Sequence, residues 1–288
     1  MRVLVTGSSS LPGFRIWKIF EEKGGEVLPL CFEHRIKNCI SLDITSSLSP
    51  SIINFKPEVI IHTAAYGDVD GCEVNKERAY RVNVLGTLNV FKLAREASSF
   101  LIYLSTDYVF DGERGDYKEY DIPNPVNYYG LTKLLGEAIV SSGEGAIVRA
   151  SSIYGFGPGR SNFAKFLFER LSKGEKVKAL VDQFTTPTQA SLLAEAIYEI
   201  AKRGIKGVHH VVGEKMSRFE FAITLAKALS LNEDLIDRAK MEEFNWKAKR
   251  PRDSSLSCSF TMERLSTDFH SKERAMEALK KELLKEYT

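Results

Sequence analysis

Short apolar segments alternate with longer segments of helical periodicity along the first half of the chain. The apolar segments cover residues 2–6, 26–31, 58–63, 100–105 and 145–149, and most of them are continuous. Continuous apolar runs are typical of parallel strands that are buried on both faces. Strands that alternate with helices predict an α/β fold with a doubly wound parallel sheet of the Rossmann type.

The pattern changes near residue 150, where four turn-forming residues lie within one loop: Gly155, Gly157, Pro158 and Gly159. We therefore expect a dinucleotide-binding domain in residues 1–150 and a smaller α/β lobe, mainly for substrate, in residues 151–288. A helix at about 190–203 is expected to pack back on the first domain.

Composition narrows the classes of partner. The 288 residues carry a net charge of +2, so neither a nucleic-acid partner nor another polyelectrolyte is expected.

No apolar run reaches about 18 residues, and the chain enters a strand at once, so we expect neither a membrane span nor a signal peptide. The four cysteines lack CxxC spacing and the five histidines do not cluster. These features predict reduced thiols, no metal site and a cytoplasmic protein.

The first apolar run leads into "TGSSSLPG", which resembles a phosphate-binding turn. Gly7 and Gly13 stand at the outer positions, but Ser10 occupies the middle position, where a glycine would bring the backbone closest to a pyrophosphate. The Ser10 hydroxyl could instead cap the following helix or donate to a phosphate. The stretch is compatible with a dinucleotide and equally with a plain strand–turn–helix.

The end of the second run bears on cofactor choice. In "CFEHR", Glu33 would suit the ribose 2′-hydroxyl of NAD, whereas His34 and Arg35 would suit the 2′-phosphate of NADP. The sequence leaves both cofactors open.

A second motif, "YYGLTK", places Tyr129 and Lys133 four residues apart, on one face of a helix. An ammonium near a phenol favours the phenolate, so we expect the pKa of Tyr129 to be lowered. Such a tyrosine can exchange a proton with a carbonyl or alcohol oxygen. Ser105 and Thr106 end an apolar strand, at the edge where open α/β sheets bind ligands.

With these motifs in place, the chain resembles the extended short-chain dehydrogenase/reductases. Among them it is most similar to the dTDP-4-dehydrorhamnose reductases and to the related regulatory β subunit of methionine adenosyltransferase. The similarity runs nearly end to end, through "LDIT", "HTAAYGDVDGCE", "RVNVLGT", "STDYVFDG", "NPVNYYGLTKLLGE", "RASSIYG", "DQFTTPT" and "KRPRDSSL".

The resemblance implies a role for each matching residue. Tyr129 would be the general acid, Lys133 would hold the nicotinamide ribose, and Thr106 would hydrogen-bond the reacting oxygen. Residues implied to contact the cofactor, NADPH with NADH as the alternative, are Gly7, Ser9, Ser10, Leu11, Gly13, Asp43, Ile44, Ala64, Ala65, Tyr66, Asn83, Tyr129 and Lys133. Residues implied to contact a nucleotide-sugar substrate are Thr106, Asp107, Tyr129, Gln183 and Arg250.

The resemblance leaves three functions open. The first is reduction of the C4 ketone of dTDP-4-dehydro-L-rhamnose, the second a non-catalytic NADP-binding subunit of methionine adenosyltransferase, and the third a nucleotide-sugar epimerase or dehydratase. Ser152 stands where the reductases tend to have tryptophan, which weakens the first. Asp107 is followed by Tyr108 rather than by a second acid, which speaks against a dehydratase. A homodimer is also left open.

Overall fold

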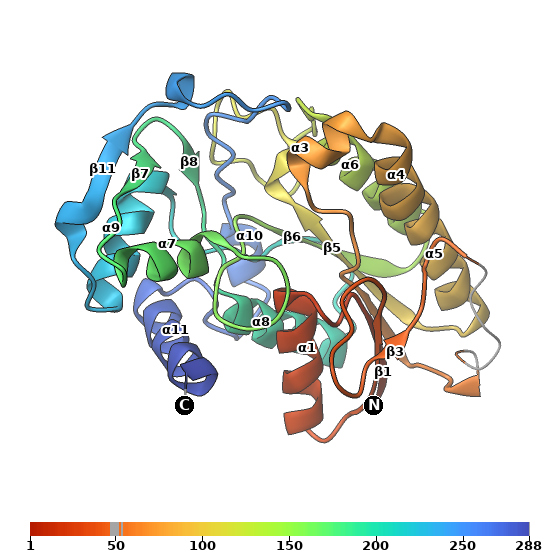
Figure 1. Cartoon of the computed structure of the whole chain (residues 1–288). Coiled ribbons are helices and arrows are strands. Elements are labelled where there is room, and N and C mark those ends of the chain that lie inside the picture. Colours follow the sequence, from red (N-terminus) through yellow and green to blue (C-terminus); the bar gives the residue numbers. More distant parts are fainter. Residues whose placement is uncertain (47–51, 53, 288) are drawn as a thin grey trace.

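A parallel sheet of seven strands forms the centre of the fold in the computed structural model (Figure 1), which describes residues 1–46, 52 and 54–287. In spatial order the strands are β3 (Ile40–Ser41), β2 (Glu26–Cys31), β1 (Arg2–Thr6), β4 (Val59–His62), β5 (Phe100–Thr106), β6 (Gly145–Ala150) and β9 (Gly207–His210). The order reverses between β1 and β4, which is the point where doubly wound sheets bind ligands. The predicted fold class is confirmed.

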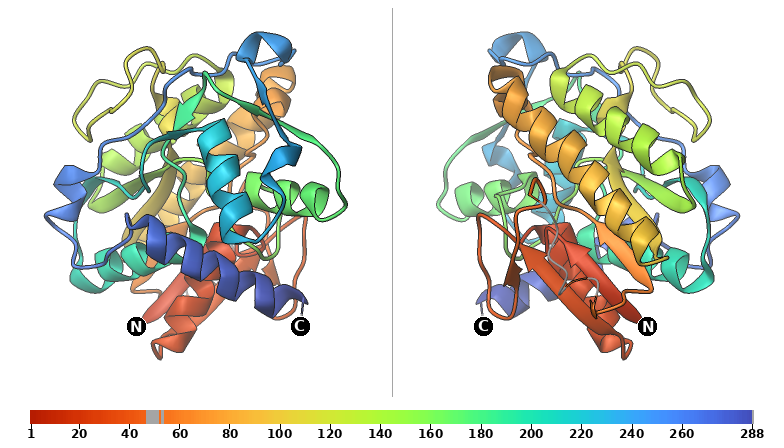
Figure 2. Two further views of the ribbon diagram at one scale, coloured as in Figure 1. Left: turned by 90° about the vertical axis from the view of Figure 1, so that its left-hand side faces the viewer. Right: turned by 90° about the vertical axis from the view of Figure 1, so that its right-hand side faces the viewer.

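Helices cover both faces of this sheet (Figures 1 and 2). The helices α1 (Leu11–Glu22) and α8 (Ala190–Arg203) pack against each other on one face, so a segment from the second half of the chain lies beside the first helix. The other face carries α3 (Val69–Val74), α4 (Lys76–Tyr80), α5 (Gly86–Glu96) and α6 (Tyr128–Ser141).

Between α4 and α5 the helix widens into one π-helical segment, η1 (Arg81–Leu85). The apolar periodicity predicted a helix here but not its π-helical segment. Such segments are rare and are frequent at functional sites. This one contains Asn83, which is buried.

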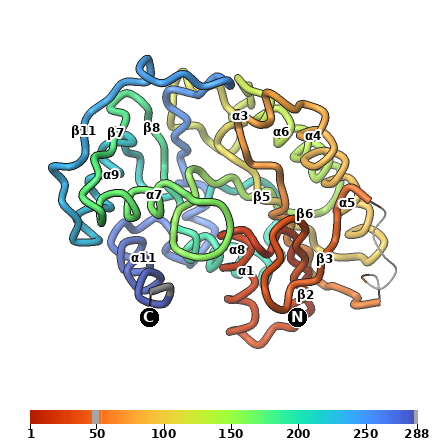
Figure 3. Tube along the Cα trace, viewed as in Figure 1, coloured from red at the N-terminus to blue at the C-terminus, as the bar shows by residue number. Residues whose placement is uncertain are grey.

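The remaining elements form the second lobe, which lies to one side of the sheet in Figure 1 and is traced in Figure 3. They are α7 (Phe163–Leu171), β7 (Val177–Leu180), β8 (Phe184–Thr185), β10 (Met216–Ser217), α9 (Arg218–Ala228), β11 (Ile236–Ala239), α10 (Ser259–Met262) and α11 (Lys272–Tyr287), with the 3-10 turns η3 (Glu233–Leu235) and η4 (Met241–Glu243). A further 3-10 turn, η2 (Asp107–Val109), follows β5 of the sheet.

One apolar core joins the lobe to the sheet. It runs from Val3 and Phe20 through Val148 to Leu167 and Phe221, all of them fully buried. The sheet and the second lobe therefore share one core, and the polar residues at the carboxyl edge of the sheet lie between them. Within the described part of the chain, no helix is long and apolar enough to cross a membrane.

Candidate active site

The turn after β1 is shaped by glycines that tolerate no side chain. Gly7 has a φ of +70°, and a Cβ there would lie 2.7 Å from the Ala64 nitrogen. A Cβ on Gly13 would lie 2.3 Å from the Gly7 carbonyl oxygen. Both glycines are therefore required for this close approach of the backbone.

Ser10 replaces the middle glycine without opening the turn. It is the N-cap of α1, where its Oγ accepts from the Gly13 nitrogen at 3.2 Å and donates to the Gly7 carbonyl at 2.7 Å. The helix has twelve residues and no acidic residue in its first turn. Its N-terminus and the surrounding amides, with Ser9 and Leu11 between the glycines, suit a pyrophosphate.

A second glycine-rich loop packs over this turn. A Cβ on Gly159 would lie 3.1 Å from the Ser10 Cα and 3.1 Å from the Leu11 nitrogen. Arg15 of α1 donates to the Phe156 carbonyl, and Glu282 of α11 accepts from the Phe156 nitrogen at 2.9 Å. The sequence predicted this loop but not its position in the fold. In the structure it covers one side of the candidate pyrophosphate site.

The candidate adenosine side lies at the ends of β2 and β3. Glu33 forms an exposed ion pair with Arg78, whose guanidinium lies 4.5 Å from the centre of the Tyr66 ring. His34 and Arg35 are exposed. The Glu33 carboxylate, which would favour NAD, is thus paired with Arg78, whereas the His34 and Arg35 side chains, which would favour NADP, are exposed to solvent.

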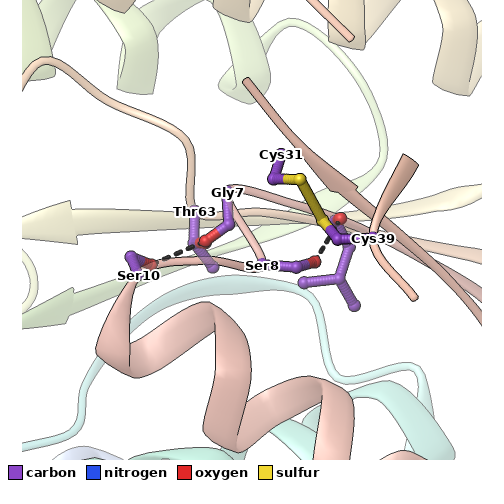
Figure 4. The surroundings of a disulfide bond; sticks show 7 residues. Gly7, Ser8, Ser10, Cys31, Cys39 and Thr63 are labelled. Atoms are coloured by element: carbon purple, nitrogen blue, oxygen red, sulfur yellow. Dashed lines mark hydrogen bonds between the residues drawn. A yellow bond between two sulfur atoms is a disulfide. The ribbon is translucent and has the colours of Figure 1, made fainter. Parts of the chain in front are cut away.

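The disulfide between Cys31 and Cys39 corrects the expectation of four reduced thiols (Figure 4). It joins the end of β2 to the residue before β3, next to the turn that holds Gly7 and Ser8. The Cα atoms of the two cysteines lie 6.0 Å apart. The conformation of the loop between them sets this distance, and the spacing of the cysteines in the sequence does not reveal it. Cys72 and Cys258 are free and buried.

Asp43 and Ile44 form a turn against the start of α5. The Asp43 carboxylate accepts from the Thr45 nitrogen at 2.8 Å, and a Cβ on Gly86 would lie 2.7 Å from Ile44 Cδ1. The carbonyl of Ile44 accepts from Asn89 at 2.9 Å. These contacts fix the turn beside the candidate adenosine site.

The segment after β4 carries Ala64, Ala65 and Tyr66. Asn83 holds it through two hydrogen bonds, because its Oδ1 accepts from the Tyr66 nitrogen at 2.7 Å and its Nδ2 donates to the Tyr66 carbonyl at 3.2 Å. Asn83 also donates to the Thr132 hydroxyl of α6 at 3.0 Å. The π-helical segment thus ties the loop of Ala64, Ala65 and Tyr66 to the helix that carries Tyr129.

Thr106 and Tyr129 meet at the carboxyl end of β5. The Thr106 side chain lies close enough to lower the pKa of Tyr129, and the Tyr108 ring packs edge-on against Tyr129 with centroids 6.0 Å apart. Ser105 points elsewhere, since it donates at 2.5 Å to Glu137, a buried residue that also pairs with Arg149. Of the two hydroxyls that end this strand, the structure places Thr106 beside the tyrosine.

Lys133 lies one turn further along α6. Its ammonium donates to the Leu104 carbonyl at 2.7 Å and lies 4.1 Å from the centre of the Tyr103 ring. Burial lowers the pKa of Lys133 to about 7, while the Glu137 carboxylate acts in the opposite direction.

The expected lowering of the Tyr129 pKa is wrong for this structure. Burial raises the pKa of Tyr129, the Thr106 side chain lowers it, and the Asp107 charge raises it further. Lys133 does not offset this burial, because its ammonium is turned toward Leu104.

Asp107 gathers hydroxyl groups from both lobes. Its Oδ1 accepts from Thr106 at 3.0 Å, and its Oδ2 accepts from Ser151 at 2.8 Å and Ser254 at 2.5 Å. Burial raises the pKa of this carboxyl, whereas the three hydroxyls lower it. Sequence reasoning selected Asp107 but missed both serines, although each lies in a motif that carried the resemblance.

Gln183 and Arg250 lie on the side of the second lobe. Gln183 donates to the Pro251 carbonyl at 3.1 Å, and Arg250 forms an ion pair with Asp70 of α3 at 3.1 Å. Arg250 and Asp70 both influence the pKa of Tyr108, which burial raises. Asp70 had no assigned role in the sequence, although it lies within "HTAAYGDVDGCE".

These features define a doubly wound dinucleotide-binding fold with a Thr–Tyr–Lys set at the carboxyl edge of its sheet. The model of the RmlD substrate binding domain matches residues 1–288, and the chain belongs to that family. The resemblance stated from the sequence is confirmed.

Relatives of two kinds are similar to this chain. Methionine adenosyltransferase 2 subunit beta of Xenopus laevis is 35% identical over 271 residues, which cover 90% of this chain and 80% of the relative. A dTDP-4-dehydrorhamnose reductase of Aggregatibacter actinomycetemcomitans is 35% identical over 274 residues, which cover 88% of this chain and 90% of the relative.

Solved structures agree with this placement. A hypothetical dTDP-4-dehydrorhamnose reductase from Sulfolobus tokodaii has a TM-score of 0.86 and 38% identity, covering 94% of this chain and 97% of its own. A dTDP-4-dehydrorhamnose reductase from Bacillus anthracis, solved in complex with NADP, has a TM-score of 0.87 and 28% identity, covering 96% and 98%.

Proposed function

We propose that the protein is an NADPH-dependent reductase that converts the C4 ketone of dTDP-4-dehydro-L-rhamnose into the alcohol of dTDP-L-rhamnose. NADH is the alternative donor. The observation that carries the proposal is the placement of Thr106 next to Tyr129 at the carboxyl end of β5, beside the switch point of the sheet. Reductases named among the relatives support it.

The side chains of the site have distinct tasks in this reaction. Bound NADPH would supply the hydride that attacks the C4 carbon. The Tyr129 hydroxyl gives its proton to the ketone oxygen, and the Thr106 hydroxyl donates a hydrogen bond to the same oxygen. A phenol is protonated at neutral pH, as a general acid must be. Burial raises the pKa of Tyr129 and so keeps it protonated.

The remaining residues serve binding. Lys133 would hold the nicotinamide ribose next to Tyr129. The loop from Gly7 to Gly13 would cradle the pyrophosphate, and Asp43 with Ile44 would contact the adenine. On the substrate side, Asp107 and Gln183 would face the sugar and Arg250 would bind its diphosphate.

A second function is favoured by one specific observation. Methionine adenosyltransferase 2 subunit beta is as similar to this chain as the reductase is, at 35% identity. A regulatory subunit would bind NADP, show no turnover of the sugar nucleotide and alter the kinetics of an added methionine adenosyltransferase.

Tyr129→Phe tests the proposal, because it removes only the phenol oxygen. In an assay of NADPH oxidation with dTDP-4-dehydro-L-rhamnose, we expect kcat to fall about 10²- to 10⁴-fold, with NADPH affinity unchanged. Tyr120→Phe is the matched control, since Tyr120 is 72% exposed. Equal turnover by the wild type and Tyr129→Phe would refute the role of Tyr129. A wild type that binds NADPH without turnover would favour the regulatory function.

A further inference from the structure

Asp70 makes two contacts with a segment almost 180 residues away. Its Oδ1 accepts from the Ala248 nitrogen at 2.9 Å and lies 3.1 Å from Nη2 of Arg250. The Arg250 side chain is 13% exposed and its Nη1 donates to the Ala248 carbonyl at 3.2 Å. One carboxylate therefore fixes both the backbone and the guanidinium of this segment.

Residues 246–254, named the strap, belong to the connection between η4 and α10, which passes near α3 (Figure 1). The Lys249 carbonyl accepts at 2.9 Å from Asn127, the N-cap of α6. At its far end Ser254 donates to Asp107. The strap is thus anchored to the helix that carries Tyr129 and to the buried carboxylate beside Thr106.

The contacts leave Arg250 able to bind an anion. A guanidinium has five N–H donors in a planar fork. Among the described residues, Nη1 of Arg250 donates to the Ala248 carbonyl, and Nη2 lies 3.1 Å from Asp70 as an ion pair. The Trp246 ring lies 5.7 Å from the guanidinium carbon. Arg250 is therefore held in one orientation while further donors stay open for charge-assisted hydrogen bonds.

We propose that Asp70 is a positioning residue that preorients Arg250 for the diphosphate of a nucleoside-diphosphate sugar. The proposal rests on the function proposed above. A free arginine loses side-chain entropy when it binds, whereas one that is already held loses less. Asp70 itself touches neither the substrate nor the cofactor in this scheme.

Asp70→Asn separates positioning from mere support of the fold. The amide oxygen still accepts from the Ala248 nitrogen, so only the charge opposite Arg250 is lost. We expect the dissociation constant of dTDP, measured by calorimetry, and the KM of the sugar nucleotide to rise about 2- to 10-fold. NADPH affinity and kcat should stay within twofold of the wild type, and Asp70→Glu should restore part of the dTDP affinity.

Two comparisons make the test decisive. In an Arg250→Gln background, Asp70→Asn should weaken dTDP binding no further. Asp237→Asn, which breaks an exposed pair with Lys176, is the matched control and should leave dTDP binding unchanged. If the wild type binds dTDP and Asp70→Asn binds it equally well, the positioning role is refuted alone. If the wild type binds no dTDP, the nucleotide-sugar function falls and the positioning role falls with it.

Discussion

The cofactor side and the substrate side of the candidate site are held by different kinds of interaction. On the cofactor side the shape comes from backbone contacts at Gly7 and Gly13, where an added Cβ would overlap main-chain atoms. On the substrate side it comes from polar side chains that reach across the lobes, such as Ser254 to Asp107 and Arg250 to Asp70. Substitutions that add volume should therefore weaken binding on the cofactor side, and substitutions that remove a charge or a hydrogen bond should weaken it on the substrate side.

Gly13→Ala should give the largest effect on the cofactor side. Its Cβ would lie 2.3 Å from the Gly7 carbonyl oxygen, so the turn must move. Overpacking of this kind typically costs about 1–3 kcal/mol. Because the strained turn is the one that would hold the pyrophosphate, a loss of the same size in binding would weaken NADPH affinity about 5- to 150-fold. Fluorescence titration with NADPH measures it.

Gly67→Ala is the control for this change. A Cβ at Gly67 meets no atom within 4 Å, so NADPH affinity should be unchanged. Undiminished NADPH binding by Gly13→Ala would show that backbone approach does not shape the cofactor side.

Lys133, on the cofactor side, differs from the glycines because it is a buried charge, and it should give an intermediate effect. Burial lowers the pKa of Lys133 to about 7 in the folded protein, from an ordinary value of 10.5. Between these values the unfolded chain binds a proton that the folded protein lacks, so the free energy of unfolding should rise with pH. The contribution is at most about 1.4 kcal/mol per pH unit.

Denaturant unfolding of the wild type and of Lys133→Met from pH 7 to 8.5, without cofactor, isolates this contribution. The variant lacks the titrating amine, so the wild type should gain stability relative to it across the window. Parallel pH profiles for the two proteins would mean that Lys133 keeps its proton in the folded state.

The sequence could predict the parts of the fold and site that depend on local pattern. The apolar runs indicated the parallel sheet, the spacing of Gly7 and Gly13 indicated the turn, and Tyr129 with Lys133 indicated one helix face. The disulfide between Cys31 and Cys39 could not be foreseen, because loop conformation brings the two thiols together.

The contacts between the lobes were also beyond the sequence. Asp70 and Arg250 are separated by 180 positions, and no periodicity relates them. The direction of the Tyr129 pKa shift could not be predicted either. The i and i+4 spacing places Lys133 on the same helix face as Tyr129, but it does not determine where the ammonium points. The Leu104 carbonyl takes that ammonium instead.

The smallest predicted effect is on the substrate side, at Ser254. Ser254→Ala removes one of three hydroxyls from the Asp107 carboxyl and leaves Thr106 and Ser151 in place. The loss of one such hydrogen bond is worth about 0.5–1.5 kcal/mol, so KM for the sugar nucleotide should rise about 2- to 10-fold. NADPH affinity, measured by titration, should not change, because among the described residues no atom of the strap is one of the nearest neighbours of Gly7 or Gly13. A fall in NADPH affinity as large as the rise in KM would show that the cofactor side and the substrate side are not held independently of each other.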